Sequence, residues 1–259
     1  MQLRNTQIQS DANIQATILI GLYRKMIQEI FSFHQVENLN WNDFIESEEN
    51  REAVACLSCW PKSWHSNGVI IYGAPKVGKT HIAGLWAQAA NAIYILQAAF
   101  NEPPRNLFDA NCNFVIDNFD DLTNTDINID NWMFDFFNIC REKNHFFLLI
   151  SRTAPSMWNI KLRDLRSRLL TLPAINIKNP NDDLLLKIAK KISKDFGINI
   201  TDEILSYILD HIKRDVPTFS ATLKMLDKLA LQKQKSITIP FVKKYIGTEK
   251  NTEKNEELR

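Results

Sequence analysis

Apolar residues between positions 69 and 177 gather in short, nearly continuous runs instead of alternating with polar residues. The runs are Val69–Tyr72, Ala92–Leu96, Phe114–Ile116, Phe146–Ile150 and Ala174–Ile177. Segments of helical length lie between them, at 79–90, 128–143 and 159–170. Because strands of this kind are buried on both faces and are joined by helices, the pattern predicts an α/β domain with a five-stranded parallel sheet.

The pattern changes after Lys178, where apolar residues recur at the 3.6-residue period of a helix. The sequence predicts helices at 182–196, 202–212 and 218–233, and a short fourth helix that starts at Pro240. Gly197 is expected to end the first of these helices, and Thr201 to cap the second. The pattern therefore predicts that this part of the chain is a small all-α domain.

These patterns divide the chain into four parts. An N-terminal extension covers 1–40, the α/β domain covers 41–178, and the helical domain covers 179–246. Residues 247–259 are charged and almost without apolar side chains, so we expect them to be disordered. Early in the α/β domain, a helix is expected from Ser47, a residue type that caps helices, to Trp60.

The composition is that of a globular protein, and it excludes several classes. The 259 residues are 45% hydrophobic and carry a formal net charge of +1, which excludes a globally basic nucleic-acid binder. Four cysteines are too few for a disulfide scaffold. No early apolar run approaches the roughly 20 residues of a membrane span, and the features of a signal peptide are missing. We therefore expect a cytoplasmic protein that does not act at a membrane.

The strongest chemical signal is a glycine-containing loop between a predicted strand and a predicted helix. The loop consists of Gly73, Ala74, Pro75, Lys76, Val77, Gly78, Lys79 and Thr80. It fits the pattern G-x-x-x-x-G-K-[ST] in full. Glycines let backbone N–H groups wrap a phosphate, and the helix N-terminus adds a favourable dipole. Lys79 is expected to reach the β- and γ-phosphates and Thr80 to hold Mg²⁺, so the sequence predicts a nucleotide site.

Asp117 directly follows the apolar run that ends at Ile116. A carboxylate at the end of a buried strand suits the second Mg²⁺-coordinating position, through water, although Asp117 and Asn118 would also suit a simple turn. Many related ATPases place a glutamate at the position of Asn118 as the base that activates water. An amide cannot accept a proton near neutral pH, so we expect slow or absent hydrolysis unless Asp120 or Asp121 takes over that role.

Taken together, residues from about 41 to 246 resemble the AAA+ module of the DnaA/Hda family. The matching segments are IIYGAPKVGKTHIAGLWA, FVIDNFDDL, FFLLISRTAPSMW, LRDLRSRL and the helical region after them. The resemblance implies a P-loop AAA+ core with a five-stranded parallel sheet and a small all-α lid. It also implies that ADP or ATP, with Mg²⁺, binds between the core and the lid.

The resemblance implies roles for three further side chains. Asp117 matches the Walker B carboxylate, and Ser151 matches sensor 1, which contacts the γ-phosphate side. Arg168 matches the arginine finger that is offered to the nucleotide of a neighbouring subunit, a role that suits an always-charged guanidinium. Judged by spacing alone, Arg168 could equally belong to a solvated helix face with Arg163 and Arg166.

Two departures from the family pattern bear on function. Pro217 stands where the family usually has its sensor 2 arginine, and Arg214 could substitute only if the helix starts at a different residue. The polar tail after the lid leaves no room for the helix-turn-helix reader that follows this module in DnaA. We therefore expect no direct sequence-specific DNA binding, and a closer likeness to Hda-like regulators, which inactivate DnaA.

The segment 28–33 is a candidate clamp-binding peptide. Hda-like proteins carry a short N-terminal peptide that docks on the DNA polymerase sliding clamp, and Gln28, Phe31 and Phe33 fit a degenerate form of it. Such a peptide would bury its aromatic anchors in a groove of the clamp. The alternative is that both phenylalanines pack on the AAA+ core. Met26 is a candidate natural start, which would place this peptide at the N-terminus.

The sequence thus favours an adaptor that binds nucleotide and the sliding clamp, stimulates ATP hydrolysis by DnaA, and limits replication initiation. A homodimer is a further possible assembly. One alternative is an active AAA+ ATPase that acts on nucleic acid, such as a helicase loader or a DnaA-like initiation factor. Another is a scaffold that binds nucleotide only for its structure.

Overall fold

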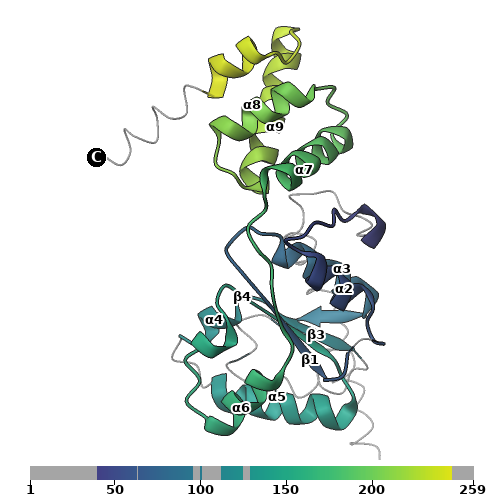
Figure 1. Cartoon of the computed structure of the whole chain (residues 1–259), viewed down its shortest axis with the longest axis vertical. Coiled ribbons are helices and arrows are strands. Elements are labelled where there is room, and N and C mark those ends of the chain that lie inside the picture. The colour runs from purple at the N-terminus through teal and green to yellow at the C-terminus, as the bar shows by residue number, and fades with distance from the viewer. Residues whose placement is uncertain (1–39, 63, 96–99, 101–111, 125–128, 247–259) are drawn as a thin grey trace, which may run out of the picture. The chain divides into compact units, whose positions relative to one another are not determined.

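A computed structural model describes residues 40–62, 64–95, 100, 112–124 and 129–246 (Figure 1). The candidate clamp peptide 28–33 and the tail 247–259 lie outside these residues. The chain forms two compact units, the first ending at Lys178 and the second beginning at Asn179. Among the helices that the structure describes, none is long and apolar enough to cross a membrane.

The first unit is built on a parallel sheet of five strands. The strands are β1 (Gly68–Tyr72), β2 (Ala92–Tyr94), β3 (Asn113–Ile116), β4 (Phe147–Ser151) and β5 (Ala174–Asn176). Their order in the sheet is β2-β3-β4-β1-β5, and every neighbouring pair is parallel. β4 therefore lies between β1 and β3, with Ser151 opposite Tyr72 at the carboxyl end of the sheet. The predicted α/β fold is confirmed.

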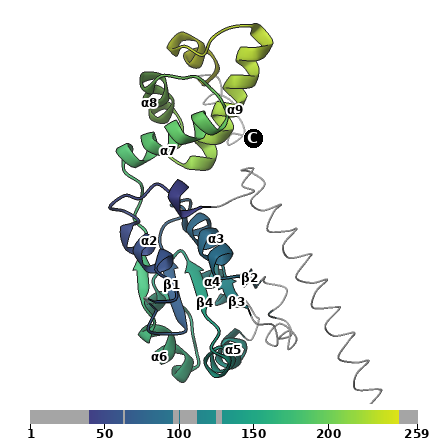
Figure 2. The same ribbon diagram turned by 90° about the vertical axis from the view of Figure 1, so that its right-hand side faces the viewer.

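Both faces of this sheet are buried, which explains why the strands read as continuous apolar runs. Ile70 of β1 belongs to a hydrophobic cluster with Phe136 and Leu165, whereas its neighbour Ile71 belongs to a second cluster with Leu57 and Trp86. Successive side chains of a strand point to opposite faces, so helices must cover both. Figures 1 and 2 show α2 and α3 on one side of the sheet and α5 and α6 on the other.

One helix of this unit precedes β1, and the others lie between the strands along the chain. They are α2 (Arg51–Ser58), α3 (Lys79–Ala89), α4 (Phe119–Leu122), α5 (Ile129–Lys143) and α6 (Arg163–Thr171), with 3-10 turns η1 (Trp41–Asp43) and η4 (Pro155–Met157).

Two helix starts in this unit differ from the sequence-based expectation. α2 begins at Arg51 after Asn50, not after Ser47, because the Asn50 side chain accepts from the Ser47 N–H at 2.9 Å and holds a turn there. α6 begins at Arg163 rather than 159. The Asp130 carboxylate accepts from the N–H groups of Lys161 and Leu162 at 2.7 Å each, which keeps that segment out of the helix.

In the described residues of the second unit, 179–246, all the regular structure is helical. It contains α7 (Asp182–Asp195), α8 (Asp202–His211), α9 (Val216–Lys233) and helical residues 239–246. One hydrophobic cluster joins all of them, and its fully buried members include Ile208, Leu223, Leu226 and Val242. α9 begins two residues earlier than expected because Asp215 caps it, accepting from the Thr218 N–H at 2.8 Å.

Candidate functional site

The predicted phosphate loop runs from the end of β1 into the start of α3. Gly78 precedes the helix with φ 98°, and Gly73 has φ 151°. A Cβ atom at Gly73 would lie 2.3 Å from the carbonyl oxygen of Ile177. Neither position suits a side chain, so the two glycines of the motif are required by the backbone path itself.

Lys79 is the first residue of α3, and its side chain turns back into the loop. Its Nζ donates to the carbonyl oxygens of Gly73 at 2.8 Å and Ala74 at 2.7 Å, and the residue is 8% exposed. Burial lowers the pKa of Lys79, and the nearby carboxylates of Asp117 and Asp120 oppose that shift. The ammonium is therefore held inside the loop, at the position from which it can meet a phosphate.

Asp117 lies one residue beyond β3 and next to Thr80. The Thr80 hydroxyl donates to Asp117 Oδ2 at 2.8 Å, and the N–H of Asn118 donates to Oδ1 at 2.7 Å. Burial raises the pKa of Asp117, and these two hydrogen bonds and Lys79 counter the increase. A hydroxyl and a carboxylate side by side are the oxygen donors that Mg²⁺ prefers, so these residues fit the predicted metal.

The raised pKa of Asp117 leads to a first prediction. The folded state holds the proton of this carboxyl more tightly than the unfolded chain, so stability falls as pH rises from the usual 3.8 through the raised value. The charged carboxylate thus costs stability at pH 7. Asp117→Asn is expected to raise the thermal midpoint without nucleotide, and to remove the Mg²⁺ dependence of nucleotide binding.

Thermal denaturation at pH 7 and nucleotide titration with Mg²⁺ or EDTA measure both effects. A lowered midpoint would mean that the carboxylate stabilises the fold. Binding that still depends on Mg²⁺ would remove Asp117 from the metal site.

Asn118 caps α4 in a left-handed conformation, with φ 53° and ψ 41°. Asparagine tolerates the left-handed conformation, whereas for other residues with a Cβ atom this conformation costs about 1–2 kcal/mol. We predict that Asn118→Glu lowers the free energy of unfolding by about 1 kcal/mol. Because it supplies a proton-accepting carboxylate, it should also speed ATP hydrolysis. Urea denaturation and phosphate release measure the two effects, with Asn118→Gly as the control that fits the backbone and accepts no proton. Hydrolysis no faster than that of the unmodified chain would mean that the missing carboxylate does not limit the reaction.

Ser151 ends β4, opposite Tyr72 at the carboxyl end of the sheet. The residue is 1% exposed, and Oγ donates to the carbonyl oxygen of Thr153 at 2.7 Å. The structure therefore gives the Ser151 side chain a local bond within its own turn. Its role as sensor 1 stays a prediction.

Arg152, the next residue, is the charged group at this strand end, and the sequence-based analysis did not single it out. Its N–H donates to Asp120 Oδ1 at 3.1 Å, and its guanidinium pairs with Asp121 at 3.1 Å. Its charge also contributes to the lowered pKa of Lys79. A search for a charged residue directly after each buried strand would have found it.

The guanidinium of Arg168 is held in place by residues of α5 and α6 in the first unit. It donates to Asn138 Oδ1 at 2.7 Å, pairs with Asp164 at 2.9 Å, and lies 4.7 Å above the ring of Phe134. Asn138 and Phe134 belong to α5, and the Arg168 side chain is 27% exposed. The structure thus packs this arginine against α5 and does not bring it to the phosphate loop of the same chain.

The helical unit has no arginine at the expected sensor 2 position. Pro217 lies in the first turn of α9, where proline fits well. Arg214 precedes the cap and pairs with Asp182 at 2.7 Å and with Asp210 at 3.3 Å. The earlier start of α9 therefore does not place Arg214 on that helix.

Comparison with known proteins agrees with this architecture. Residues 182–246 match the sequence family described as the lid domain of Hda. An uncharacterized protein of Haemophilus influenzae is 34% identical over 132 residues, which cover 49% of this chain and 57% of that protein. The chain therefore spans little more than half the length of this relative.

Two solved structures share the fold. Domain III of the replication initiation protein DnaA from Thermotoga maritima gives a TM-score of 0.68 at 16% identity, over 80% of this chain and 95% of that one. AMPPCP-bound DnaA from Aquifex aeolicus gives 0.63 at 20% identity, over 73% of this chain and 66% of that one. At these identities the likeness shows the fold alone. The chain thus resembles an AAA+ module of the DnaA/Hda type in two respects, the sequence of residues 182–246 and the fold.

Proposed function

We propose that the loop of residues 73–80 binds the phosphates of an adenine nucleotide. The loop geometry supports this, because Lys79 is held among the loop carbonyls and Thr80 is hydrogen-bonded to Asp117. Thr80 and Asp117 would hold Mg²⁺, Asp117 through water, and the metal would neutralise charge on the phosphates. The Aquifex aeolicus DnaA with the same fold is bound to AMPPCP, an adenine nucleotide analogue.

Hydrolysis by the chain itself is proposed to be weak. Asn118 follows the Walker B aspartate where a proton-accepting carboxylate would be needed, and its left-handed backbone suits asparagine. Asp120 and Asp121 are engaged elsewhere, since both accept hydrogen bonds from Arg152. Bound nucleotide would then set the state of the protein instead of being turned over quickly.

We further propose that the chain regulates replication initiation by stimulating ATP hydrolysis in DnaA. The observation that carries this role is the match of the helical unit to the Hda lid over residues 182–246. In this proposal Arg168 is the arginine finger that approaches the nucleotide of DnaA. Gln28, Phe31 and Phe33 are proposed to bind the sliding clamp and so bring the chain to newly replicated DNA.

The direct test is an assay of phosphate release by ATP-loaded DnaA. The chain is added with nucleotide and with the sliding clamp loaded on DNA, and the clamp is left out in a parallel reaction. Faster release that needs both the chain and the clamp supports the proposal. If release is unchanged although the chain binds nucleotide, the regulatory role fails and the nucleotide site stands.

The clamp contact has a test of its own. Phe31→Ala is expected to abolish clamp binding in surface plasmon resonance without affecting nucleotide affinity, because an aromatic anchor carries much of such an interaction. Clamp affinity equal to that of the unmodified chain would remove the peptide from the proposal.

A further inference from the structure

Tyr94 carries a buried hydroxyl to which the proposed function gives no role. It is the last residue of β2, is 8% exposed, and belongs to the hydrophobic cluster that contains Ile71 and Trp86. Among the described residues, this hydroxyl has no hydrogen-bond partner. A buried polar group without a partner destabilises a fold, so a hydroxyl in this position calls for a physical explanation.

Tyr94 and Asp117 lie at the same end and on the same face of the sheet. β2 and β3 are parallel neighbours in which Tyr94 is opposite Val115, a member of the same cluster. Asp117 follows Val115 by two residues, and its bond to the Thr80 hydroxyl shows that its carboxylate also faces α3. With strands about 4.8 Å apart and about 3.3 Å per residue, the two Cα atoms are separated by about 8 Å, which a tyrosine side chain can span.

The packing of α3 brings Thr80 to the same place. α3 packs against β2 and β3 (Figure 2), and its contribution to the cluster of Tyr94 includes Ala83 and Ala87, one turn apart. Thr80 precedes Ala83 by three residues and so lies on the same side of the helix. The side of α3 that covers Tyr94 therefore leads to the hydroxyl that binds Asp117.

The charge of Asp117 acts on the Tyr94 hydroxyl. Burial raises the pKa of Tyr94, and the negative charge of Asp117 raises it further. The hydroxyl therefore keeps its proton and is a hydrogen-bond donor. This distinguishes Tyr94 from Trp86, whose indole N–H also lacks a partner but whose ring stacks on Trp64, with 5.0 Å between the ring centroids.

On the basis of the nucleotide site proposed above, we propose that Tyr94 is a positioning residue of its magnesium site. Its hydroxyl donates to the Asp117 carboxylate when Mg²⁺ and nucleotide are bound. A carboxylate can accept about four hydrogen bonds, and within the described chain Asp117 accepts two, from Thr80 and Asn118. Carboxylates that hold a metal are themselves oriented by hydrogen bonds from their neighbours. A third donor would fix the orientation of Asp117 and offset the cost of burying its charge.

The test compares Tyr94→Phe, which removes only the hydroxyl, with the unmodified full chain. Mn²⁺ takes the place of Mg²⁺ as a paramagnetic probe, and electron paramagnetic resonance measures its affinity for the ADP-bound chain. Tyr94→Phe is expected to weaken Mn²⁺ binding about tenfold or more. The affinity for ADP in EDTA should stay within about twofold, because the hydroxyl acts through a metal ligand. An equal loss of ADP affinity in EDTA would assign the hydroxyl to the nucleotide and overturn the proposal.

Tyr72→Phe is the matched control. Tyr72 ends β1 at the same end of the sheet. Its neighbour Ile71 belongs to the cluster of Tyr94, so the Tyr72 side chain faces the opposite side of the sheet. Mn²⁺ affinity of the ADP-bound Tyr72→Phe chain should stay within about twofold of the unmodified chain. Equal losses in the two variants would mean that the effect is not specific to the hydroxyl near Asp117, and would overturn the proposal.

The chain without nucleotide provides a second measurement. Tyr94→Phe is expected to raise its thermal midpoint, because the variant removes a buried hydroxyl that lacks a partner. A lowered midpoint would mean that the hydroxyl stabilises the free fold, and would overturn the proposal. If the unmodified chain takes up no ADP, the proposed nucleotide site is wrong and Tyr94 has no metal site to support. If ADP binds and Mn²⁺ affinity is the same with and without the hydroxyl, the nucleotide site stands and only the role of Tyr94 is wrong.

Discussion

Lys79→Ala is expected to raise the dissociation constant for ADP and ATP by about 100-fold or more. Charge-assisted hydrogen bonds contribute roughly 1.5–3 kcal/mol each, and one buried ammonium would serve two phosphates. Lys79 is 8% exposed, so bulk water screens its interaction with a bound phosphate less than it would at an open surface. Isothermal titration calorimetry with each nucleotide, in the presence of Mg²⁺, measures the effect.

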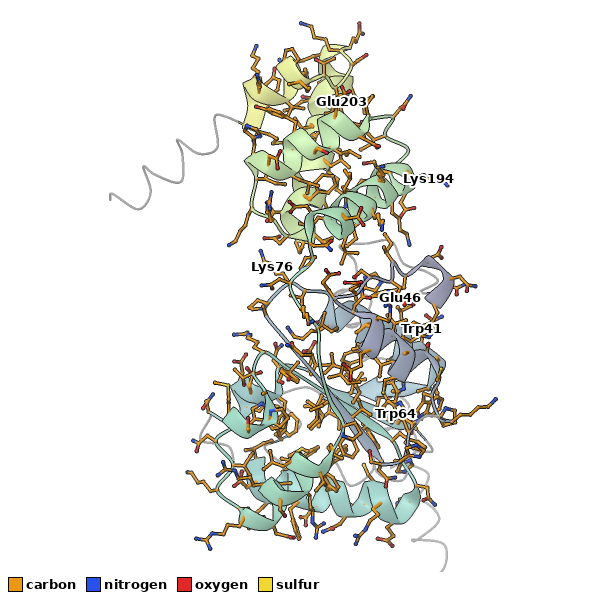
Figure 3. All side chains as sticks on the ribbon, in the orientation of Figure 1. Trp41, Glu46, Trp64, Lys76, Lys194 and Glu203 are labelled. Carbon is orange, nitrogen blue, oxygen red and sulfur yellow. The ribbon has the colours of Figure 1, made fainter. Side chains whose placement is uncertain are left out.

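Lys76→Ala is the matched control for this experiment. Lys76 belongs to the same loop and has the same charge, but its side chain is exposed (Figure 3). Its removal should change nucleotide affinity by no more than a few-fold, as is usual for a screened surface charge. If both variants lose affinity to the same extent, the loop would attract nucleotide only through its net charge. If Lys79→Ala binds normally, the proposed site is wrong.

Arg168→Ala is expected to return ATP hydrolysis by DnaA to its unstimulated rate. Arginine fingers supplied by a partner accelerate hydrolysis by roughly 10³–10⁵, because the guanidinium neutralises charge that develops in the transition state. In the structure this guanidinium is already ordered by Asn138, Asp164 and Phe134. An ordered side chain loses less conformational entropy when it meets a partner's nucleotide, and phosphate release by ATP-loaded DnaA measures the outcome.

Arg166→Ala on the same helix separates this role from general charge. Arg166 is exposed on α6 two residues away, so the variant loses an equal charge. It should keep most of the stimulation. Full stimulation by Arg168→Ala, with a lowered thermal midpoint, would assign Arg168 to the packing of α6 against α5 instead. Loss of stimulation in both variants would indicate a basic docking face without a specific finger.

The sheet could be predicted because its strands are short and buried on both faces. Ile70 and Ile71 pack into different hydrophobic clusters, so the period-2 alternation of a one-sided sheet is absent and continuous runs identify the strands. Helix starts were less predictable. The start of α6 depends on Asp130, which is distant in sequence, and no local pattern near residue 159 reports that contact.

The phosphate loop could be predicted from its motif, because the two glycines of the motif correspond to a particular backbone geometry. The sequence on either side also predicts the strand before the loop and the helix after it. Asp117 was found in the same way, from its place after a strand. Arg152 was missed because the resemblance directed attention to Ser151, and only the hydrogen bond to Thr153 shows where that hydroxyl points. The surroundings of Arg168 depend on how α5 packs, which sequence spacing does not reveal.

The two hydrogen bonds from Lys79 to the carbonyls of Gly73 and Ala74 have a consequence for ligand choice. An anion that binds Lys79 must replace the hydrogen bonds that its ammonium makes to these two carbonyls. The binding free energy is therefore the difference between the new hydrogen bonds to the anion and the ones that are lost. A lone inorganic phosphate gains little from this exchange, whereas a diphosphate can also engage the backbone N–H groups of the loop. The free loop thus discriminates against the abundant small anions of the cell before the base or the sugar of a nucleotide makes any contact.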